Sequence, residues 1–488
     1  MRVIPPRLLL AGAGAGAGAG AVLLAGCSGG PVPDVAPTPT GTAGPWDQRP
    51  VVRLSFDVAD DLSSVSGRER IAFTPDERVC ELVFRNWPNK PTTAEPGSGL
   101  VVTEVRVDGE VVDARDEEAG APAAAPAGTL LRVPLAQCVD AGTTLTADLR
   151  FDLQLGVDVD ERIGRSSRGD AAWFATAFPL LAWERGVGWD ETPAVAVAGE
   201  TAVSEEFRLE SLQVTAPSEH VVQATGSLED RTAGAGDPDR TTTEFSAPSV
   251  RDVAVHVGDY EVREFDVEGV RVHFAGVEGR VEAPLDDWEE VIGESLEDLV
   301  DLLGPFPYDD LWITVVESDS SGIEFPGAVQ VADVDPQRRR PLITHELAHM
   351  WFYSLVGNDQ GRDPWLDEAF ATFAQRVADG DDVSLDDLPR RTLTDVGRPL
   401  SWFTRYRSPA TTFYERVYTA GGTALVEARD RVGAEEFDAA LQRYLRENAH
   451  TIATPEDVAE AFAELPEVLE VLVEVGALPE ADDPRAAP

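Results

Sequence analysis

Two hydrophobic patterns follow each other along this chain of 488 residues. In residues 49–262, apolar and polar residues alternate over short segments such as VVRLSFDV, TLTADLRFDLQL and DVAVHVGDYEV. Alternation with a period of two buries one face of a strand, and the Gly, Pro and Asp residues between the segments favour turns. The pattern predicts an antiparallel β domain over residues 49–262.

From residue 263 onward the pattern becomes mixed. VRVHFAG and LWITVVES predict strands, whereas PLDDWEEVIGESLEDLVDLLG repeats its apolar residues at helical spacing and ends at Gly304 and Pro305. Residues 437–444 and the segment after Thr454 predict further helices. Because a single core rarely extends over so long a chain, residues 263–488 are expected to form a second domain, and the fold class is α+β.

The first residues have the pattern of an export signal. Arg2 and Arg7 precede an apolar run of Ala, Gly and Leu that ends in Leu-Ala-Gly-Cys at Cys27. This predicts a signal peptide over residues 1–27, and its ending resembles a bacterial lipobox, in which Cys27 carries the lipid. The alternative is an uncleaved membrane anchor, although the Gly and Ala content makes a weak span. The Pro-, Gly- and Thr-rich residues 28–48 predict a tether at the outer face of a bacterial cell membrane.

Acidic residues dominate the charge of the chain. Asp and Glu total 88 against 40 Lys and Arg, which leaves a net charge of −48. Such a surface repels phosphate backbones, so nucleic acid is excluded as a partner. The sequence predicts no particular oligomeric state.

Two cysteines remain after Cys27, and both lie in the predicted β domain. They are Cys80 and Cys138. An even pair of cysteines in an exported protein predicts a disulfide. The alternative is a pair of buried free thiols.

The pattern His-Glu-x-x-His predicts a metal site. His345 and His349 are four residues apart, with Glu346 beside the first. On a helix, positions i and i+4 share one face, so both imidazoles can reach one metal ion. A water-activating zinc hydrolase needs this arrangement, with two neutral nitrogens on the metal and a carboxylate that takes the proton.

A third ligand is predicted on the next helix. Apolar residues at helical spacing predict a helix over residues 364–378, with Asp363 as its N-cap and Pro364 in its first turn. Glu368 lies near the start of this helix, with eighteen residues between it and His349. Two His and one Glu leave a fourth position open for water, which is typical of a catalytic zinc site, with one zinc ion per chain.

The two segments HELAHMWF and WLDEAFA together resemble the aminopeptidase N and leukotriene A4 hydrolase family of gluzincin metallopeptidases. The variant here is similar to bacterial exported members. The resemblance implies an N-terminal β-saddle or sandwich domain followed by a thermolysin-like mixed α/β zinc-peptidase domain. It also implies peptide substrates, with Glu346 as the general base.

The segment from Gly322 to Gly327, GIEFPG, resembles the family's G-x-M-E-N motif, with Phe325 in place of Asn. The resemblance implies that the backbone at Gly322 lies along the substrate and that Glu324 binds its free amino terminus. An exopeptidase needs such a carboxylate. It holds the ammonium group of the substrate at a fixed distance from the metal, so that the peptide bond after the first residue lies at the metal. The alternative is an exposed acidic residue in a loop.

Tyr418 precedes Ala420 and Gly421 and so occupies the position of the family's catalytic tyrosine, with Ala in place of Lys. A phenol near the metal can donate a hydrogen bond to a developing oxyanion. Tyr414 is expected to have a packing role. The alternative is that both tyrosines are ordinary aromatic residues on a helix surface.

These observations together predict a zinc-dependent aminopeptidase. One alternative is a zinc endopeptidase, which would not require a free amino terminus. Another is a peptide-binding or scaffolding module of the cell envelope without catalysis, although such a module would not need Glu346.

Overall fold

The computed structural model describes residues 43–157, 161–197, 205–234, 237–316 and 322–479. The predicted signal peptide with Cys27, and most of the predicted tether, lie outside these residues. Within the described ranges, no helix is long and apolar enough to cross a membrane.

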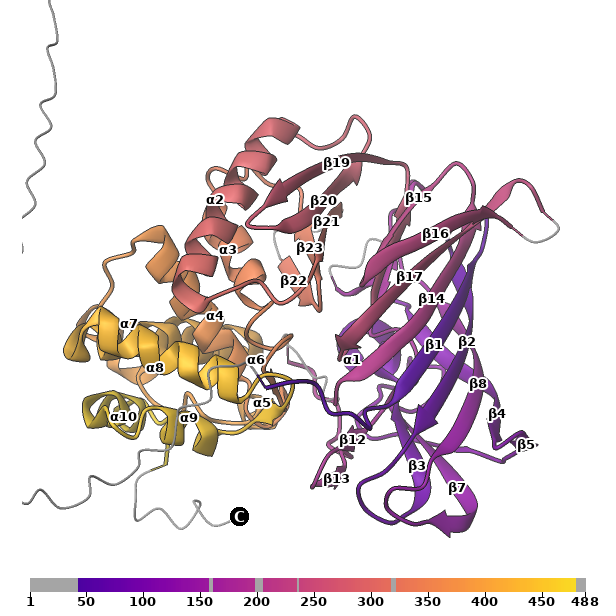
Figure 1. Cartoon of the computed structure of the whole chain (residues 1–488), viewed down its shortest axis with the longest axis horizontal. Coiled ribbons are helices and arrows are strands. Elements are labelled where there is room, and N and C mark those ends of the chain that lie inside the picture. The colour runs from indigo at the N-terminus through magenta and orange to yellow at the C-terminus, as the bar shows by residue number, and fades with distance from the viewer. Residues whose placement is uncertain (1–42, 158–160, 198–204, 235–236, 317–321, 480–488) are drawn as a thin grey trace, which may run out of the picture. The chain divides into compact units, whose positions relative to one another are not determined.

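An eight-stranded sheet is the largest element of the β-rich part (Figure 1). Its strand order is β16-β17-β14-β1-β2-β8-β4-β5. The strands are β1 (Val51–Val58), β2 (Ser64–Phe73), β4 (Gly99–Val107), β5 (Glu110–Val111), β8 (Leu145–Gln154), β14 (Phe207–Pro217), β16 (Ser227–Ala233) and β17 (Arg240–Val250). Alternate residues of β1 and β2 are buried, as their sequences predict. The antiparallel prediction is confirmed for this sheet except at β1 and β14, a parallel pair that needs a long connection.

Two four-stranded sheets complete the β-rich part, in the orders β15-β18-β10-β9 and β11-β3-β7-β6. The strands are β3 (Val79–Arg85), β6 (Arg115–Glu117), β7 (Leu130–Val139), β9 (Ile163–Arg165), β10 (Ala171–Ala175), β11 (Leu180–Leu181), β15 (Val221–Ala224) and β18 (Ala254–Gly258), with a small ribbon of β12 (Trp183–Glu184) and β13 (Gly188–Trp189) and the short helices η1 (Trp87–Asn89) and α1 (Pro91–Ala94). Val52, Phe84 and Phe174 show how all three sheets share one hydrophobic core. The predicted disulfide is present and joins β3 and β7 through Cys80 and Cys138.

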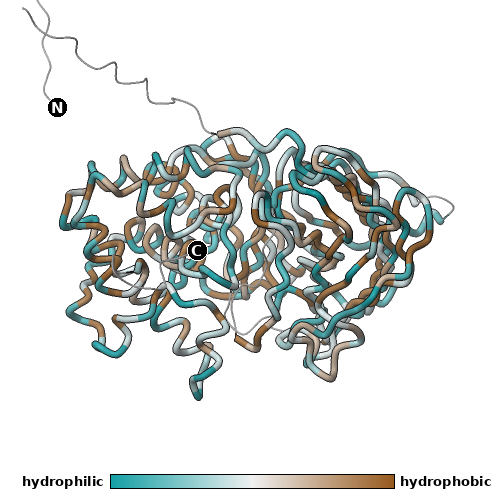
Figure 2. Tube along the Cα trace, turned by 90° about the horizontal axis from the view of Figure 1, so that it is seen from below, coloured by the Kyte–Doolittle hydropathy of each residue, from teal (hydrophilic) through white to brown (hydrophobic). Residues whose placement is uncertain are grey.

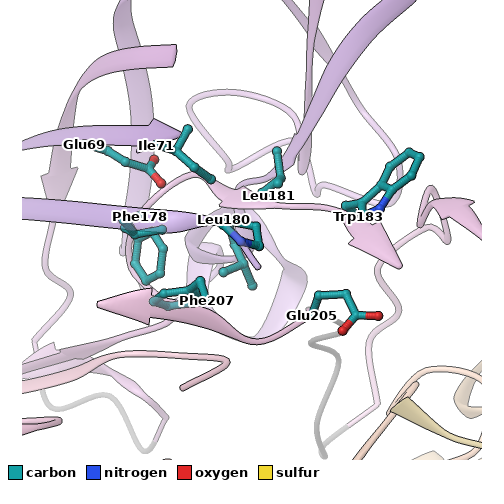
Figure 3. Close-up of a pocket in the computed structure, with 10 residues that line it drawn as sticks. Glu69, Ile71, Phe178, Leu180, Leu181, Trp183, Glu205 and Phe207 are labelled. Atoms are coloured by element: carbon teal, nitrogen blue, oxygen red, sulfur yellow. The ribbon is translucent and has the colours of Figure 1, made fainter. Parts of the chain in front are cut away.

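Hydrophobic and hydrophilic residues alternate along the strands of the β-rich part (Figure 2). Glu69 interrupts this pattern, because it lies on the buried face of β2 and is only 3% exposed. Figure 3 shows Glu69 beside Ile71 and Phe178 at a small cavity of about 10 Å³. Neither carboxylate oxygen of Glu69 has a hydrogen-bond partner among the described residues. Burial raises the pKa of this carboxyl well above its ordinary value.

A five-stranded mixed sheet opens the second part of the fold, in the order β19-β20-β21-β23-β22. Its strands are β19 (Tyr260–Val267), β20 (Val270–Val277), β21 (Asp310–Val316), β22 (Gly322–Phe325) and β23 (Ala328–Ala332). The strands β20, β21 and β23 are parallel, and the edge strands β19 and β22 are antiparallel to their neighbours. The predicted amphipathic helix is α2 (Leu285–Leu303), whose apolar stripe is buried and which ends at Gly304.

The remainder is mainly helical, as the sequence predicts. Its elements are α3 (Arg340–Ala348), α4 (Trp365–Asp379), α5 (Leu400–Phe403), α6 (Pro409–Phe413), the π-helix η4 (Tyr414–Gly421), α7 (Gly422–Val432), α8 (Ala434–Glu447), α9 (Pro455–Ala461) and α10 (Pro466–Glu474), with the short segments β24 (Gly357–Asn358), η2 (Leu385–Asp387), η3 (Arg390–Thr392) and β25 (Ile452–Ala453). A capping box of Thr454 and Asp457 begins α9. One hydrophobic core joins these helices to α2 and the five-stranded sheet. The predicted α+β class is confirmed.

Candidate metal centre

The two histidines of the His-Glu-x-x-His pattern lie at the end of α3. Pro341 stands in the first turn of the helix, where a missing N–H is tolerated. The helix ends at Ala348, so His349 is its C-cap rather than an interior residue. Its backbone keeps helical angles, φ −64° and ψ −10°, and therefore presents His349 on the same face as His345.

Glu368 reaches the histidines from the first turn of α4, which packs against α3. The predicted capping by Asp363 is wrong, because α4 begins one residue later with Pro364 in the cap position. A carboxylate oxygen of Asp363 instead accepts a hydrogen bond from Nε of Arg362 at 3.1 Å. The position of Glu368 therefore depends on the packing of α4 against α3 and not on a side-chain cap.

The three predicted ligand atoms form a small triangle. His345 Nε2 lies 3.1 Å from His349 Nε2 and 3.2 Å from Glu368 Oε2. The distance from His349 Nε2 to the same oxygen is 3.4 Å. A tetrahedral zinc ion with bonds of about 2.0–2.1 Å separates its ligand atoms by about 3.3 Å. The donor set and its spacing therefore fit zinc.

Hydrogen bonds and charges prepare these side chains for a cation. Nδ1 of His349 lies 3.1 Å from the backbone oxygen of Phe352 and donates to it, which leaves Nε2 free as a ligand. Burial alone would raise the pKa of Glu368, but hydrogen bonds from His345 and His349 outweigh it and lower the pKa to about 2. The carboxylate is therefore ionised at neutral pH, as a metal ligand must be.

Glu346 and Glu324 form a second acidic layer beside the triangle. Oxygen atoms of these two side chains and a ring nitrogen of His349 all lie within 4.8 Å of one another. Both carboxyl groups are buried, with exposed fractions of 4% for Glu346 and 3% for Glu324. Burial raises the pKa of both groups above the ordinary value, and their mutual repulsion raises that of Glu346 further. The site thus holds two carboxyl groups that are not part of the ligand triangle.

Glu324 lies in the edge strand β22 and not in an exposed loop, so the alternative interpretation of this residue is wrong. Its Oε1 is buried and has no hydrogen-bond partner within the described part of the chain. A buried carboxylate oxygen without a partner is unfavourable unless a bound group supplies a donor. The geometry therefore leaves one strong acceptor available beside the metal triangle.

Gly322 at the start of β22 lies directly against the Glu346 carboxylate. A Cβ atom at this glycine would be 2.4 Å from Cγ, Cδ and Oε1 of Glu346. Ordinary contacts between such atoms are about 3.5–4.0 Å. The absence of a side chain at this position is therefore what allows the strand to approach the carboxylate.

Tyr418 also reaches the site, on the π-helix η4. Its hydroxyl donates a hydrogen bond to Oε1 of Glu368, and its ring stacks on His345 with centroids 5.6 Å apart. A Cβ atom at Gly421 would be 2.7 Å from the Cβ of Ala369, so this glycine allows η4 to pack closely on α4. Tyr414 is 60% exposed and stacks on Tyr418 at 4.8 Å, which agrees with a packing role. π-Helical turns such as those of η4 occur frequently at functional sites.

The β-rich part contributes a buried charge cluster that the sequence reasoning missed. Lys90 and Arg162 both pair with Glu161, at 3.2 and 3.3 Å. The Arg162 guanidinium lies 5.5 Å from the ring centre of Phe325, next to Glu324, and counteracts the effect of burial on the pKa of that carboxyl. The sequence around Glu161 and Arg162 does not indicate that these residues are buried. Only the fold shows that their charges face the site.

A hydrogen-bonded chain extends this cluster toward the turn that follows α3. Arg162 donates to the hydroxyl of Thr176 at 3.2 Å, and this hydroxyl donates to Asp252 at 2.5 Å. Tyr353 donates to the same oxygen of Asp252 at 3.3 Å. The backbone of Tyr353 has φ 94°, which side chains rarely adopt and which costs of order 1–3 kcal/mol. The chain therefore links the β-rich part to a strained turn just after His349.

Residues 328–475 match the model of the peptidase family M1 domain. This segment contains both helices of the metal triangle and the π-helix with Tyr418. Over this segment, the chain is similar to peptidase family M1 domains. The resemblance to the aminopeptidase N family that the sequence suggested is thereby confirmed.

Several curated proteins that are similar to this chain are named aminopeptidases. An aminopeptidase N from Haemonchus contortus is 28% identical over 149 residues, which cover 28% of this chain and 15% of the relative. An aminopeptidase N from Streptomyces lividans is 28% identical over 168 residues, which cover 29% of this chain and 19% of the relative. The match thus spans less than a fifth of the length of these relatives.

Solved structures resemble the fold over most of the chain. The M1 zinc metallopeptidase from Deinococcus radiodurans superposes with a TM-score of 0.63 at 18% identity, covering 91% of this chain and 98% of the other. A mutant of that protein bound to a Tyr-Ser-Ala substrate also gives 0.63, at 17% identity over 92% and 98% of the two chains. The order of a β domain and a mixed α/β domain therefore agrees with a known two-part fold.

Proposed function

We propose that this protein is a zinc-dependent aminopeptidase that removes single residues from the amino terminus of peptides. The observation that carries the proposal is the buried, partnerless Oε1 of Glu324 beside the triangle of His345, His349 and Glu368. An ammonium group bound there would satisfy the buried acceptor and would form a charge-assisted hydrogen bond. Only a peptide with a free amino terminus offers such a group next to its first peptide bond.

The chain's own side chains suit peptide hydrolysis. When bound to His345, His349 and Glu368, zinc would supply Lewis-acid activation of a water molecule and of the scissile carbonyl. Glu346 accepts the proton of the attacking water and returns it to the leaving amine. The raised pKa of Glu346 brings it nearer to the working pH, which favours a group that must both accept and release a proton. Tyr418 donates its hydroxyl to the oxyanion that develops on the carbonyl.

The similarity to named proteins supports the same substrate class. Two curated relatives are named aminopeptidase N, and one structural neighbour is described as bound to a Tyr-Ser-Ala substrate.

The test is hydrolysis of a panel of amino-acid amides with a chromogenic leaving group, beside N-acetylated copies of each. Zinc-loaded protein is expected to cleave only the free amines. Glu324→Gln removes the charge that holds the ammonium and should raise KM at least tenfold, because charge-assisted hydrogen bonds contribute about 1.5–3 kcal/mol. Glu464→Gln, at an exposed position of the same domain, is the matched control. Equal cleavage of the acetylated copies would contradict an aminopeptidase and indicate an endopeptidase.

Glu346→Gln separates catalysis from metal binding. The variant should keep one zinc ion per chain, measured by atomic emission, because Glu346 is outside the ligand triangle. Its turnover should fall by at least 100-fold, since general-base catalysis contributes about 10²–10⁴-fold. Unchanged turnover would refute the assigned base, and an absence of activity in zinc-loaded wild-type protein would favour a binding module.

We also propose that the protein is exported and lipid-anchored through Cys27. The signal and lipobox pattern of residues 1–27 supports this, as does the Cys80–Cys138 disulfide, because stable disulfides belong to oxidising compartments. Cys27→Ser should move the protein from the membrane fraction to the soluble exported fraction in a bacterial host. Ser28→Ala is the control. Retention of Cys27→Ser in the membrane would contradict the lipid anchor.

A further inference from the structure

An arginine-lined groove crosses the exposed face of the eight-stranded sheet. It has a volume of about 480 Å³, and its cationic lining consists of Arg53 on β1, Arg68 and Arg70 on β2, Arg106 on β4 and Arg150 on β8. This arginine groove thus holds five of the 40 basic residues of a chain whose net charge is −48. A concentration of positive charge on so acidic a protein needs a physical reason.

The strand register places like charges directly opposite each other in the arginine groove. Arg53 is the cross-strand partner of Arg70, and Arg68 is the partner of Arg150. Neighbouring strands are about 4.8 Å apart, and like charges in this relation destabilise a sheet. Stability of the sheet alone therefore does not explain these pairs.

Carboxylates neutralise only part of the groove. Glu210 lies 2.5 Å from Arg53, and Asp148 lies 2.9 Å from Arg70. Glu104 lies 3.0 Å from Arg106 and 3.4 Å from Arg150. The arginines of these pairs are 41–58% exposed, and such surface pairs contribute only about 0–1 kcal/mol each. An incoming anion can therefore displace them at small cost.

The remaining groups of the groove leave its positive charge in place. Arg68 is exposed, and no ion pair is found for it among the described residues. Glu69 lies between Arg68 and Arg70 on β2, but it belongs to the opposite, buried face of the sheet, so its carboxyl does not face these arginines.

The arrangement offers two seats for anionic groups. In each opposite pair, Arg53 with Arg70 and Arg68 with Arg150, two guanidinium groups on neighbouring strands can bind the same anionic group. Each guanidinium donates two parallel N–H hydrogen bonds, an arrangement called a fork. A phosphate has enough oxygens for two forks, whereas a single fork already satisfies both oxygens of a carboxylate. Arg68 and Arg70 are two residues apart on one face of β2, which separates the two seats by about 6.6 Å.

The neutral part of the lining indicates what connects the two anionic groups. Ser55, Ser211 and Gln213 line the groove beside the arginines and offer hydroxyl and amide groups. No aromatic side chain is among the residues that line the described groove, so it provides no platform for stacking a base. A hydroxylated spacer without bases therefore fits better than a nucleic acid strand.

We propose that the arginine groove binds a polyol-phosphate chain, in which short hydroxylated spacers join successive phosphates. The distance between these phosphates matches the two-residue repeat of a β-strand. The two arginine pairs hold successive phosphates, and the serine and glutamine side chains bind the hydroxyl groups between them. This ligand site is independent of the proposed peptidase activity.

The test measures binding of the full chain to soluble poly(glycerol phosphate) by isothermal titration calorimetry. The salt concentration is about 0.15 M, where screening limits repulsion from the acidic remainder of the surface. Arg53→Gln combined with Arg68→Gln removes one arginine from each seat and should weaken binding at least tenfold. Arg78→Gln combined with Arg115→Gln makes the same charge change on exposed residues of the β-rich part outside the groove, and it should leave binding within twofold.

A further variant and a control ligand test the proposal. Arg53→Lys combined with Arg68→Lys keeps the charge but loses the forks, and should weaken binding several-fold. Circular dichroism and amide hydrolysis verify that each variant is folded and active. No saturable binding by the wild-type chain would overturn the proposal. Equal losses in the two glutamine variants, or equal affinity for poly-glutamate, would overturn it too, because both indicate non-specific attraction.

Discussion

The close approach of Gly322 to Glu346 allows a sharp prediction about the proposed base. A methyl group in Gly322→Ala would lie 2.4 Å from three atoms of the Glu346 side chain. The backbone of Gly322 is not in the left-handed region, so alanine meets no strain of its own there. The substitution therefore acts through the contact with Glu346.

The size of the effect follows from the distances. A normal carbon contact begins at about 3.5 Å, so the Glu346 carboxylate must retreat by about 1 Å or the strand β22 must move by as much. Glu346 is only 4% exposed and has little room to adjust. A misplacement of about 1 Å in a catalytic group costs roughly 100-fold in rate, which corresponds to about 2.7 kcal/mol at the barrier. We expect kcat of Gly322→Ala to fall by about this factor.

The assay combines kcat for a chromogenic amino-acid amide with the zinc content of the purified protein. Zinc content should stay at one ion per chain, because the contact does not involve the ligand triangle. Gly293→Ala in α2 is the matched control, since a Cβ there meets its nearest neighbour, Val267, at an ordinary 3.8 Å. This control should retain wild-type kcat.

A kcat of Gly322→Ala within twofold of the wild type, with full zinc content, would refute the reasoning. It would mean either that Glu346 is not the base or that the carboxylate has space that the structure does not show. A variant that loses zinc would instead show that the whole site had shifted.

Three further predictions concern other parts of the molecule. Tyr418→Phe keeps the ring that stacks on His345 but removes the hydroxyl, so kcat should fall by about 10²–10³ while zinc content stays constant. Removing the Cys80–Cys138 disulfide, which spans 58 residues, by double substitution with Ser should lower the free energy of unfolding by about 2–4 kcal/mol in urea denaturation, and an unchanged value would contradict this. Glu69→Leu should raise the free energy of unfolding by about 1–3 kcal/mol at pH 8, because it removes a buried carboxyl without a partner. The gain should be smaller at pH 4. Because burial raises the pKa of Glu69, only the unfolded chain ionises this carboxyl above about pH 4.5, and the destabilisation that Glu69 causes grows as the pH rises. An equal gain at both pH values would contradict this explanation.

Local patterns of the sequence determined much of the metal centre. The four-residue spacing of His345 and His349 and the apolar repeat around Glu368 are properties of helices, whose geometry depends on neighbouring residues only. The alternation in residues 49–262 predicted strands for the same reason. Even so, the exact ends of the helices were not predictable, because His349 is a cap and Pro364 replaces Asp363 at the start of α4.

Tertiary structure alone decided which other groups face the metal centre. The burial of Glu324 depends on the pairing of β22 with β23, and the positions of Lys90 and Arg162 depend on how the β-rich part meets that strand. Tyr418 reaches Glu368 because Gly421 lets a π-helix pack closely against α4.

The arginine groove has the same origin as these tertiary contacts. Arg68 and Arg150 are far apart in the sequence and meet only through strand register, as Arg53 and Arg70 do on β1 and β2. Spacing along the chain sets which side chains share one helix or strand face. Contacts between distant segments depend on register and packing, and these are determined by the whole core rather than by any single segment.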